Sequence, residues 1–125
     1  MDAAIHEALA RGHVIDITAT GRTTGEPRRV EIVFHNIDGR IYITGMPVAG
    51  RTRAWLRNLE HDPRMTFHLK GHVRADLPAT ARVVTDPDER RRVFEWVTTN
   101  AWNQDPEQMQ AHSPLIEVVF EAAAA

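Results

Sequence analysis

Apolar and polar residues alternate in several short segments of the chain, which is the pattern of strands that bury one face. In segment 29–37, the apolar residues Val30, Ile32 and Phe34 fall on one side. Asp38-Gly39 follows directly, and this turn signal predicts a hairpin with segment 40–44. The other expected strands are 14–20, 65–70, 73–85 with an interruption near Pro78, and 113–121.

Other segments repeat apolar residues at the spacing of an amphipathic helix. The expected helices cover residues 2–11, 52–62 and 86–99. Asp86 suits the N-cap of the last helix, with Pro87 in the first helical position. A polar loop is expected between this helix and the last strand, and the tail 122–125 is expected to fray.

Short strands in mostly hairpin order, with helices inserted between them, are typical of α+β proteins. Five or six strands and about three helices predict a mostly antiparallel sheet that curls into a small barrel. The 125 residues suffice for one domain, 1–125, and are too few for a second core.

Composition excludes several classes of protein. The absence of cysteine excludes disulfides and thiolate nucleophiles, and it fits a reducing compartment. The formal charge of −2 does not mark the chain as a nucleic-acid binder. No apolar segment is long enough to span a membrane and no signal peptide is recognisable, so a cytoplasmic protein is expected.

Cations gather in the loop GRTTGEPRR, residues 21–29. Its glycines allow successive backbone N–H groups to converge on an anion, and Thr24 adds a hydroxyl donor. Arg22 and Arg28 supply charge in a forked geometry that suits phosphates and carboxylates. Arg29 is expected to point to the opposite sheet face. The alternative is a long hairpin loop with solvated arginines.

The helix expected at 52–62 begins with Arg51 and Arg53 and ends with Glu60 and Asp62. This order is the reverse of the one that the helix dipole favours. An anion bound at the helix N-terminus would turn that penalty into a gain. Chance placement on a solvated helix is the alternative. Because the two basic loops flank neighbouring strands, they are expected to form one anion site.

The histidines do not predict a metal centre, because they show no HExxH spacing and no third ligand. His35 and His68 fall on the polar faces of their strands and are expected to be exposed. The run Arg90–Arg92 stands beside Asp88 and Glu89, which favours a solvated helix face.

Three stretches together resemble one protein family. TGRTTGEPR (20–28), AWLRNL (54–59) and DPRMTFHLKG (62–71) are similar, in sequence and in order, to the deazaflavin-dependent nitroreductase family. That family belongs to the flavin and deazaflavin oxidoreductases, whose split β-barrel is related in shape to pyridoxamine phosphate oxidase. The resemblance implies the same fold for this chain.

The resemblance also implies a cofactor, coenzyme F-420, which is a deazaflavin with a phospholactyl-oligoglutamate tail. Arg22 and Arg28 are expected to meet the anions of this tail. The backbone from Thr44 to Pro47 is expected to line the ring, with Trp55 and Asn58 nearby. Charge pattern and resemblance together assign these residues to the cofactor: Arg22, Thr24, Pro27, Arg28, Thr44, Gly45, Met46, Pro47, Arg51, Arg53, Trp55 and Asn58.

The implied reaction is hydride transfer from reduced F-420 to a flat, electron-poor acceptor such as a quinone, an enone or a nitroaromatic. Trp55, Trp96 and Trp102 are candidate substrate contacts, with packing in the core as the alternative. Two other functions stay open at this point: the same fold with flavin mononucleotide (FMN), and a non-catalytic binder of an amphipathic acid such as a fatty acid. The oligomeric state is open, and a homodimer is one option by analogy with other split barrels.

Overall fold

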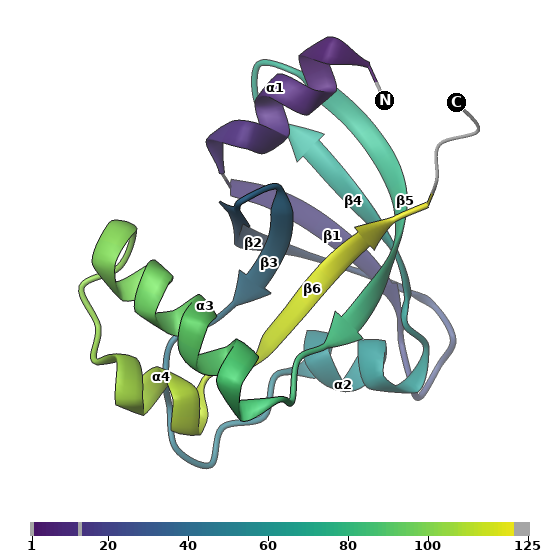
Figure 1. Ribbon diagram of the computed structural model, residues 1–125. Coiled ribbons are helices and arrows are strands. Elements are labelled where there is room, and N and C mark those ends of the chain that lie inside the picture. Colours follow the sequence, from purple (N-terminus) through teal and green to yellow (C-terminus); the bar gives the residue numbers. More distant parts are fainter. Residues whose placement is uncertain (1, 13, 122–125) are drawn as a thin grey trace.

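A computed structural model describes residues 2–12 and 14–121 (Figure 1). Its strands form a closed, antiparallel barrel in the order β1-β2-β3-β6-β5-β4, and β4 pairs back with β1. This confirms the predicted antiparallel barrel. The strands are β1 Val14–Thr20, β2 Pro27–Ile37, β3 Arg40–Thr44, β4 Arg64–Lys70, β5 Arg74–Val83 and β6 Leu115–Phe120. The tail 122–125, expected to fray, lies outside the described residues.

Helices cover both ends and one side of the barrel (Figure 1). They are α1 Ala3–Arg11, α2 Ala54–His61, α3 Pro87–Asn100 and α4 Pro106–His112. The described residues thus contain one helix more than expected, because α4 lies in the stretch predicted to be a polar loop. Asp105 caps α4 by accepting a hydrogen bond from the Glu107 N–H at 2.9 Å, and Pro106 stands in its first turn.

The alternating residues of the strands fill the barrel, as predicted. Ile15, Ile17 and Phe67 are at most 1% exposed. The rings of Phe34 and Phe67 meet edge to face with their centroids 5.3 Å apart. The interior is therefore a packed apolar core, and binding sites must lie at the barrel ends or between its covering elements.

Strand β5 runs without a break through Pro78, so the expected interruption is wrong. Pro78 stands opposite Thr66 of β4, and its carbonyl accepts a hydrogen bond from the Glu121 N–H at 3.1 Å. The N and C=O of one strand residue face the same side, here toward β6. Because the β5–β6 ladder begins only at Ala79, no ladder bond requires the N–H that proline lacks.

A second apolar layer lies outside the barrel, where α3 and α4 pack on it. His35 of β2 is buried in this layer at 4% exposure, so its expected exposure is wrong. The indoles of Trp96 and Trp102 pack edge to face on its ring, with centroids 6.2 and 5.1 Å away. The outer face of β2 is thus covered by helices that strand alternation alone does not reveal.

Arg90 is not part of a solvated face, in contrast to expectation. Its guanidinium donates hydrogen bonds to the carbonyls of Gln110 and Ser113 at 2.8 Å, and it lies 5.1 Å from the centre of the Phe94 ring. Arg90 therefore joins α3 to the end of α4. Its neighbour Arg91 fits the expectation, because it is exposed and pairs with Asp88 at 3.1 Å.

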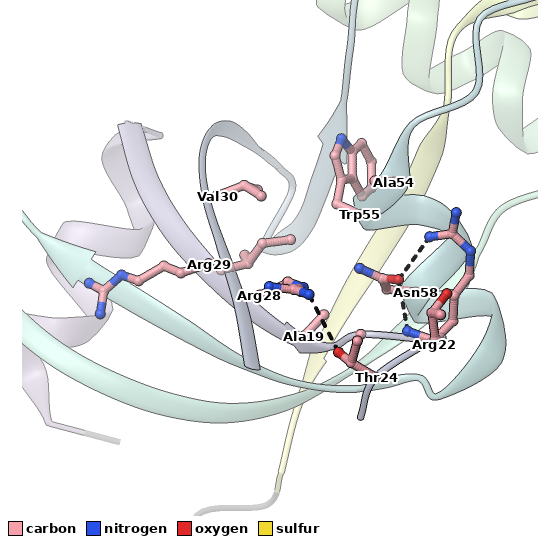
Figure 2. Close-up of a pocket in the computed structure, with 12 residues that line it drawn as sticks. Ala19, Arg22, Thr24, Arg28, Arg29, Val30, Ala54, Trp55 and Asn58 are labelled. Carbon is pink, nitrogen blue, oxygen red and sulfur yellow. Dashed lines mark hydrogen bonds between the residues drawn. The ribbon is translucent and has the colours of Figure 1, made fainter. Parts of the chain in front are cut away.

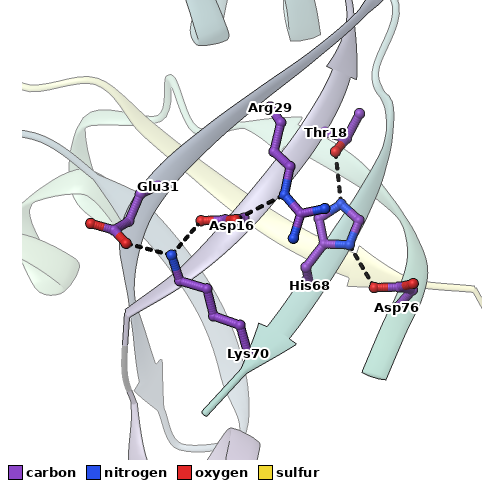
Figure 3. A network of polar contacts seen from close by, with 7 residues as sticks. All are labelled: Asp16, Thr18, Arg29, Glu31, His68, Lys70 and Asp76. Carbon is purple, nitrogen blue, oxygen red and sulfur yellow. Dashed lines mark hydrogen bonds and ion pairs between the residues drawn. The ribbon is translucent and has the colours of Figure 1, made fainter. Parts of the chain in front are cut away.

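A polar network covers the outer face of β1, β2, β4 and β5 (Figure 3). His68 is 8% exposed rather than open to solvent, because its ring bridges Thr18 Oγ1 at 2.7 Å and Asp76 Oδ1 at 2.6 Å. In the same network Asp16 accepts hydrogen bonds from Arg29 and Lys70. These two cations hold the pKa of Asp16 below its usual value.

Candidate functional site

A cavity of about 350 Å³ lies where the loop between β1 and β2 meets α2, at one end of the barrel (Figure 2). One part of its wall is apolar and comprises Ile17, Ala19, Val30, Ala54 and Trp55. The other part is polar and comprises Gly21, Arg22, Thr23, Thr24, Arg28, Arg29 and Asn58. The cavity therefore combines a surface for a flat apolar group with a cationic rim.

The loop 21–26 closes on itself and carries Arg28 against its backbone. The Gly21 N–H donates to the Glu26 carbonyl, and the Gly25 N–H donates to the Gly21 carbonyl, both at 2.8 Å. A Cβ at Gly21 would lie 3.1 Å from the Glu26 carbonyl oxygen and 3.3 Å from the Arg28 side chain. A side chain at position 21 would therefore crowd the Glu26 carbonyl and the Arg28 side chain.

Thr24 directs Arg28 from within the same loop. Its Oγ1 accepts hydrogen bonds from the Glu26 N–H at 3.2 Å and from Arg28 Nη2 at 3.4 Å (Figure 2). Both contacts are exposed and long, so the threonine guides the guanidinium without neutralising its charge.

Asn58 of α2 ties the loop to the helix. Its Oδ1 accepts hydrogen bonds from the Arg22 backbone N–H at 3.1 Å and from Arg22 Nη1 at 3.0 Å (Figure 2). Asn58 is 5% exposed but Arg22 is exposed, so both contacts are partly sheltered from water. The sequence prediction that Arg22, Arg28, Trp55 and Asn58 lie together matches this arrangement.

The rim of the cavity carries unbalanced positive charge. None of its lining residues is acidic. Arg29 is neutralised by Asp16 at 2.8 Å, and it extends away from Arg28 as expected (Figure 2). Within the described residues, Arg22 and Arg28 form no ion pair with a carboxylate. Two free guanidinium groups at the edge of an apolar cavity favour an anionic ligand.

The N-terminus of α2 adds to the positive electrostatic potential at the cavity. Its N-cap residue is Arg53, and no side chain caps the helix N-terminus. The first N–H groups of a helix lack partners within the helix and carry the positive end of its dipole. Ala54 and Trp55 of this first turn line the cavity.

The second basic loop does not join this cavity, in contrast to the expected single site. Arg51 and Arg53 line a separate depression on another side of α2. Arg53 is 9% exposed and its Nη2 donates to the Met46 carbonyl at 2.5 Å. Burial lowers the pKa of Arg53, with a further contribution from Arg51. Arg53 thus holds the loop after β3 in place rather than facing the cavity.

The other residues expected at the cofactor do not line the cavity. Thr44 is 2% exposed and its hydroxyl donates to the Pro114 carbonyl. Gly45 packs against Arg53, while Met46 is 45% exposed. Pro27 pairs with Thr20 at the first position of β2. Pro47, next in the loop after β3, is partly exposed.

Of the three candidate substrate contacts, only Trp55 borders the cavity. Trp96 and Trp102 belong to the layer around His35, as the alternative of core packing proposed. Conversely, sequence reasoning missed the apolar wall formed by Ile17, Ala19 and Val30. Their alternation predicted inward-facing side chains but not that these residues approach an open end of the barrel.

Residues 2–12 and 14–121 contain no cluster of three or more histidine or acidic side chains placed to hold a metal ion. Among the helices described, none has the length and apolar character needed to cross a membrane.

Comparison with known proteins identifies the family. A structure of a conserved hypothetical protein from Mycobacterium tuberculosis superposes with a TM-score of 0.71 at 21% identity, covering 97% of this chain and 81% of that chain. A structure described as a putative pyridoxamine 5'-phosphate oxidase from Listeria innocua gives 0.67 at 14% identity, with coverages of 94% and 91%. A structure described as an F420 reductase gives 0.66 at 17% identity, covering 94% of each chain.

These likenesses show the split-barrel fold that the sequence predicted. The sequence itself matches the family model described as F420H(2)-dependent quinone reductase over residues 1–122, which is nearly its whole length. The match agrees with the basic cavity and with the resemblance carried by residues 20–28 and 54–59. The chain therefore belongs to the quinone reductase family that uses reduced F-420.

Proposed function

We propose that the cavity between the β1–β2 loop and α2 binds reduced F-420, and that the protein passes a hydride from it to a flat, electron-poor acceptor such as a quinone. Family membership supports the cofactor and the class of reaction. The observation that carries the placement is the pair Arg22 and Arg28, which lie beside an apolar wall and form no ion pair with any carboxylate that the structure describes.

The residues of the cavity fit the two chemical parts of this cofactor. In the proposal, Arg22, Arg28 and the Thr24 hydroxyl bind the phosphate and carboxylates of the tail, since forked guanidinium groups match both anions. The flat ring lies against the apolar wall, with Trp55 at its edge. Asn58 fixes Arg22 through two hydrogen bonds and so holds the binding loop ready.

When bound, the reduced deazaflavin supplies the hydride. The chain itself binds the cofactor, orients it and shields its face from water. In this proposal the apolar wall of Ile17, Ala19 and Val30 excludes water from the ring. No pair of acidic or basic side chains positioned for proton transfer lines the cavity, which agrees with a reaction whose chemistry resides in the cofactor.

Titration of F-420 into the protein tests the placement. Arg22→Gln and Arg28→Gln each remove a charge-assisted contact, so each should weaken binding about 10-fold or more. Arg91→Gln, which removes an exposed surface cation of α3, is the matched control and should bind normally. Unchanged affinity in the double variant Arg22→Gln/Arg28→Gln would refute the tail site.

The visible spectrum of the purified protein separates a yellow flavoprotein from a colourless protein that has no bound cofactor. A protein that retains FMN is yellow and bleaches on reduction, and this result would favour the FMN alternative. Binding of F-420 without turnover of any quinone would favour the non-catalytic binder. We expect F-420 binding together with quinone reduction.

A homodimer and a cytoplasmic location belong to the same proposal. A further chain with this fold is described as a domain-swapped dimer, with a TM-score of 0.64 at 18% identity. The absence of cysteine suits a reducing compartment. Light scattering coupled to size-exclusion chromatography measures the mass in solution, and a mass near 14.1 kDa would refute the dimer.

A further inference from the structure

A second basic depression, of about 260 Å³, lies on the far side of α2 from the cofactor cavity. Helix α2 divides the two spaces, because the residues that line them alternate at helical spacing. Ala54, Trp55 and Asn58 line the cavity. Arg53, Leu56, Arg57 and Glu60 line the depression, together with Arg51 and the chain around His112.

The cations of this depression are only weakly balanced. Arg57 and its helical neighbour Glu60 approach to 3.9 Å, and both side chains are about half exposed. Ion pairs at the protein surface contribute little to the free energy of folding. Arg51 forms no ion pair within the part of the chain that the structure describes. His112, at the end of α4, also lines the depression.

These cations also lie at the N-terminus of α2, which is the end of a helix where positive charge is unfavourable unless an anion is bound. Arg51 and Arg53 flank the positive end of the α2 dipole, and no side chain caps the helix. An exposed cation there is unfavourable. Arg53 is buried and donates to the Met46 carbonyl, whereas the Arg51 side chain has no hydrogen-bond partner within residues 2–12 and 14–121.

The depression also offers an apolar surface and an unused polar group. Leu56, Ala111 and Pro114 contribute apolar atoms beside the arginines. Ser113 lines the same space, is 4% exposed, and has a hydroxyl without a hydrogen-bond partner. Cations around a small apolar surface match a carboxylate carried on a flat apolar body.

We propose that this depression binds the carboxylate of an aromatic acid through Arg51 and Arg57, as a ligand site separate from the cofactor cavity. The first turn of α2 borders both spaces, with Trp55 on the cavity and Leu56 on the depression, so the helix stands between an acid held there and the cavity.

Calorimetric titration without cofactor tests the binding site directly. The probes are 2-naphthoate and its neutral counterpart 2-naphthamide, which share size and ring. Wild type should bind the acid at least about 10-fold more tightly than the amide, as expected for a charge-assisted contact. The variant Arg51→Gln/Arg57→Gln should lose this preference and Arg91→Gln should keep it. Equal affinity of wild type for both probes, or a preference that survives in the double variant, would refute the site.

Two further measurements separate this proposal from the cofactor site. Arg22→Gln/Arg28→Gln should leave the naphthoate preference unchanged, even if the proposed function fails. If Arg51→Gln/Arg57→Gln weakens only F-420 with a long glutamate tail and not tail-shortened F-420, the cations serve the tail and the proposal is wrong.

Discussion

Asn58 holds both the backbone and the side chain of Arg22 through a single oxygen atom, at 3.1 and 3.0 Å. The two residues are 36 positions apart in the chain. One contact thus fixes the position of the binding loop and the direction of one of its cations. A substitution at Asn58 is therefore expected to alter stability and cofactor affinity separately, depending on the new side chain.

Asn58→Ala should lower the free energy of unfolding by about 1 kcal/mol, because it removes two partly buried hydrogen bonds to Arg22, whose exposed side chain can turn to water. Asn58→Asp keeps an acceptor for both donors but adds negative charge at the cavity. It should therefore retain most of the stability while weakening F-420 binding about 10-fold. Urea unfolding and F-420 titration measure the two effects. Asn103→Ala, on an exposed loop, is the control for stability.

Gly45→Ala should displace Arg53. An added Cβ would lie 3.2 Å from Arg53 Nη2 and 3.3 Å from Cζ, so the guanidinium must move away from the Met46 carbonyl. The expected loss is about 1 kcal/mol, the value of one hydrogen bond. In an Arg53→Ala background, Gly45→Ala should lower the free energy of unfolding only slightly, since the guanidinium that it would displace is absent. Additive losses in urea unfolding would contradict this coupling.

Arg82→Ala should loosen α3 from the barrel. Arg82 donates to Glu89 of α3 and to Glu117 of β6, and Glu89 is 9% exposed. Its removal leaves the Glu89 carboxylate without its cation, whereas Glu117 keeps its ion pair with Arg40 at 3.0 Å. Because the Arg82 side chain is itself 43% exposed, water offsets part of the loss, and we expect about 1–3 kcal/mol. Arg91→Ala should change the melting temperature far less.

The ion pair of Arg82 and Glu89 also predicts that the stability of the protein depends on pH in the acid range. The hydrogen bonds of Arg82 hold the pKa of Glu89 below its usual value. The ion pair therefore stabilises the protein fully above the pKa that Glu89 has in the unfolded chain, about 4.3. This stabilisation is lost as the pH falls through the lower pKa that Glu89 has in the folded protein. Arg82→Ala should unfold with less change in stability between pH 5 and pH 3 than wild type.

His35 should make the protein sensitive to mild acid. Burial lowers the pKa of His35, so the native state resists protonation while the unfolded chain accepts a proton below about pH 6.5. Stability should therefore fall as pH drops below that value, by at most about 1.4 kcal/mol per pH unit. Urea unfolding of His35→Leu between pH 7.5 and 5.5 should show a shallower dependence. A slope equal to that of wild type, or an equal effect of exposed His6→Gln, would contradict this assignment.

The strands were predictable because alternation is a local property. Residues such as Ile15, Ile17 and Phe67 face the barrel wherever a strand forms. Alternation does not say what covers the other face, which is why His35 and His68 were expected to be exposed. His35 lies under a helix that is far away in sequence, and His68 is sheltered by partners on adjacent strands.

Helix α4 was within reach of the sequence. Asp105-Pro106 repeats the N-cap and proline signal of Asp86-Pro87, but only seven residues follow and few are apolar. Its buried residue is Met109, which packs in the layer outside the barrel. A helix this short is fixed by tertiary packing more than by its own pattern.

The candidate site was only partly predictable for a geometric reason. The loop with Arg22 and Arg28 meets Trp55 and Asn58 as expected, because a strand pair and a helix bring them together. Whether Arg51 and Arg53 face the same space depends on where α2 begins, since each residue turns a helix by about 100°. Sequence reading places a helix start only within a few residues, which is too coarse to choose a face.

The closure of the sheet has a consequence for how such a protein diversifies. Each strand has a neighbour on both sides, so none of the six is an edge strand along its whole length. The pairing is staggered, because β2 pairs with β1 over 27–33 and with β3 over 34–37. The connecting segments around α2 lie outside these ladders, so substitutions that change the ligand preference there leave the strand pairing in place.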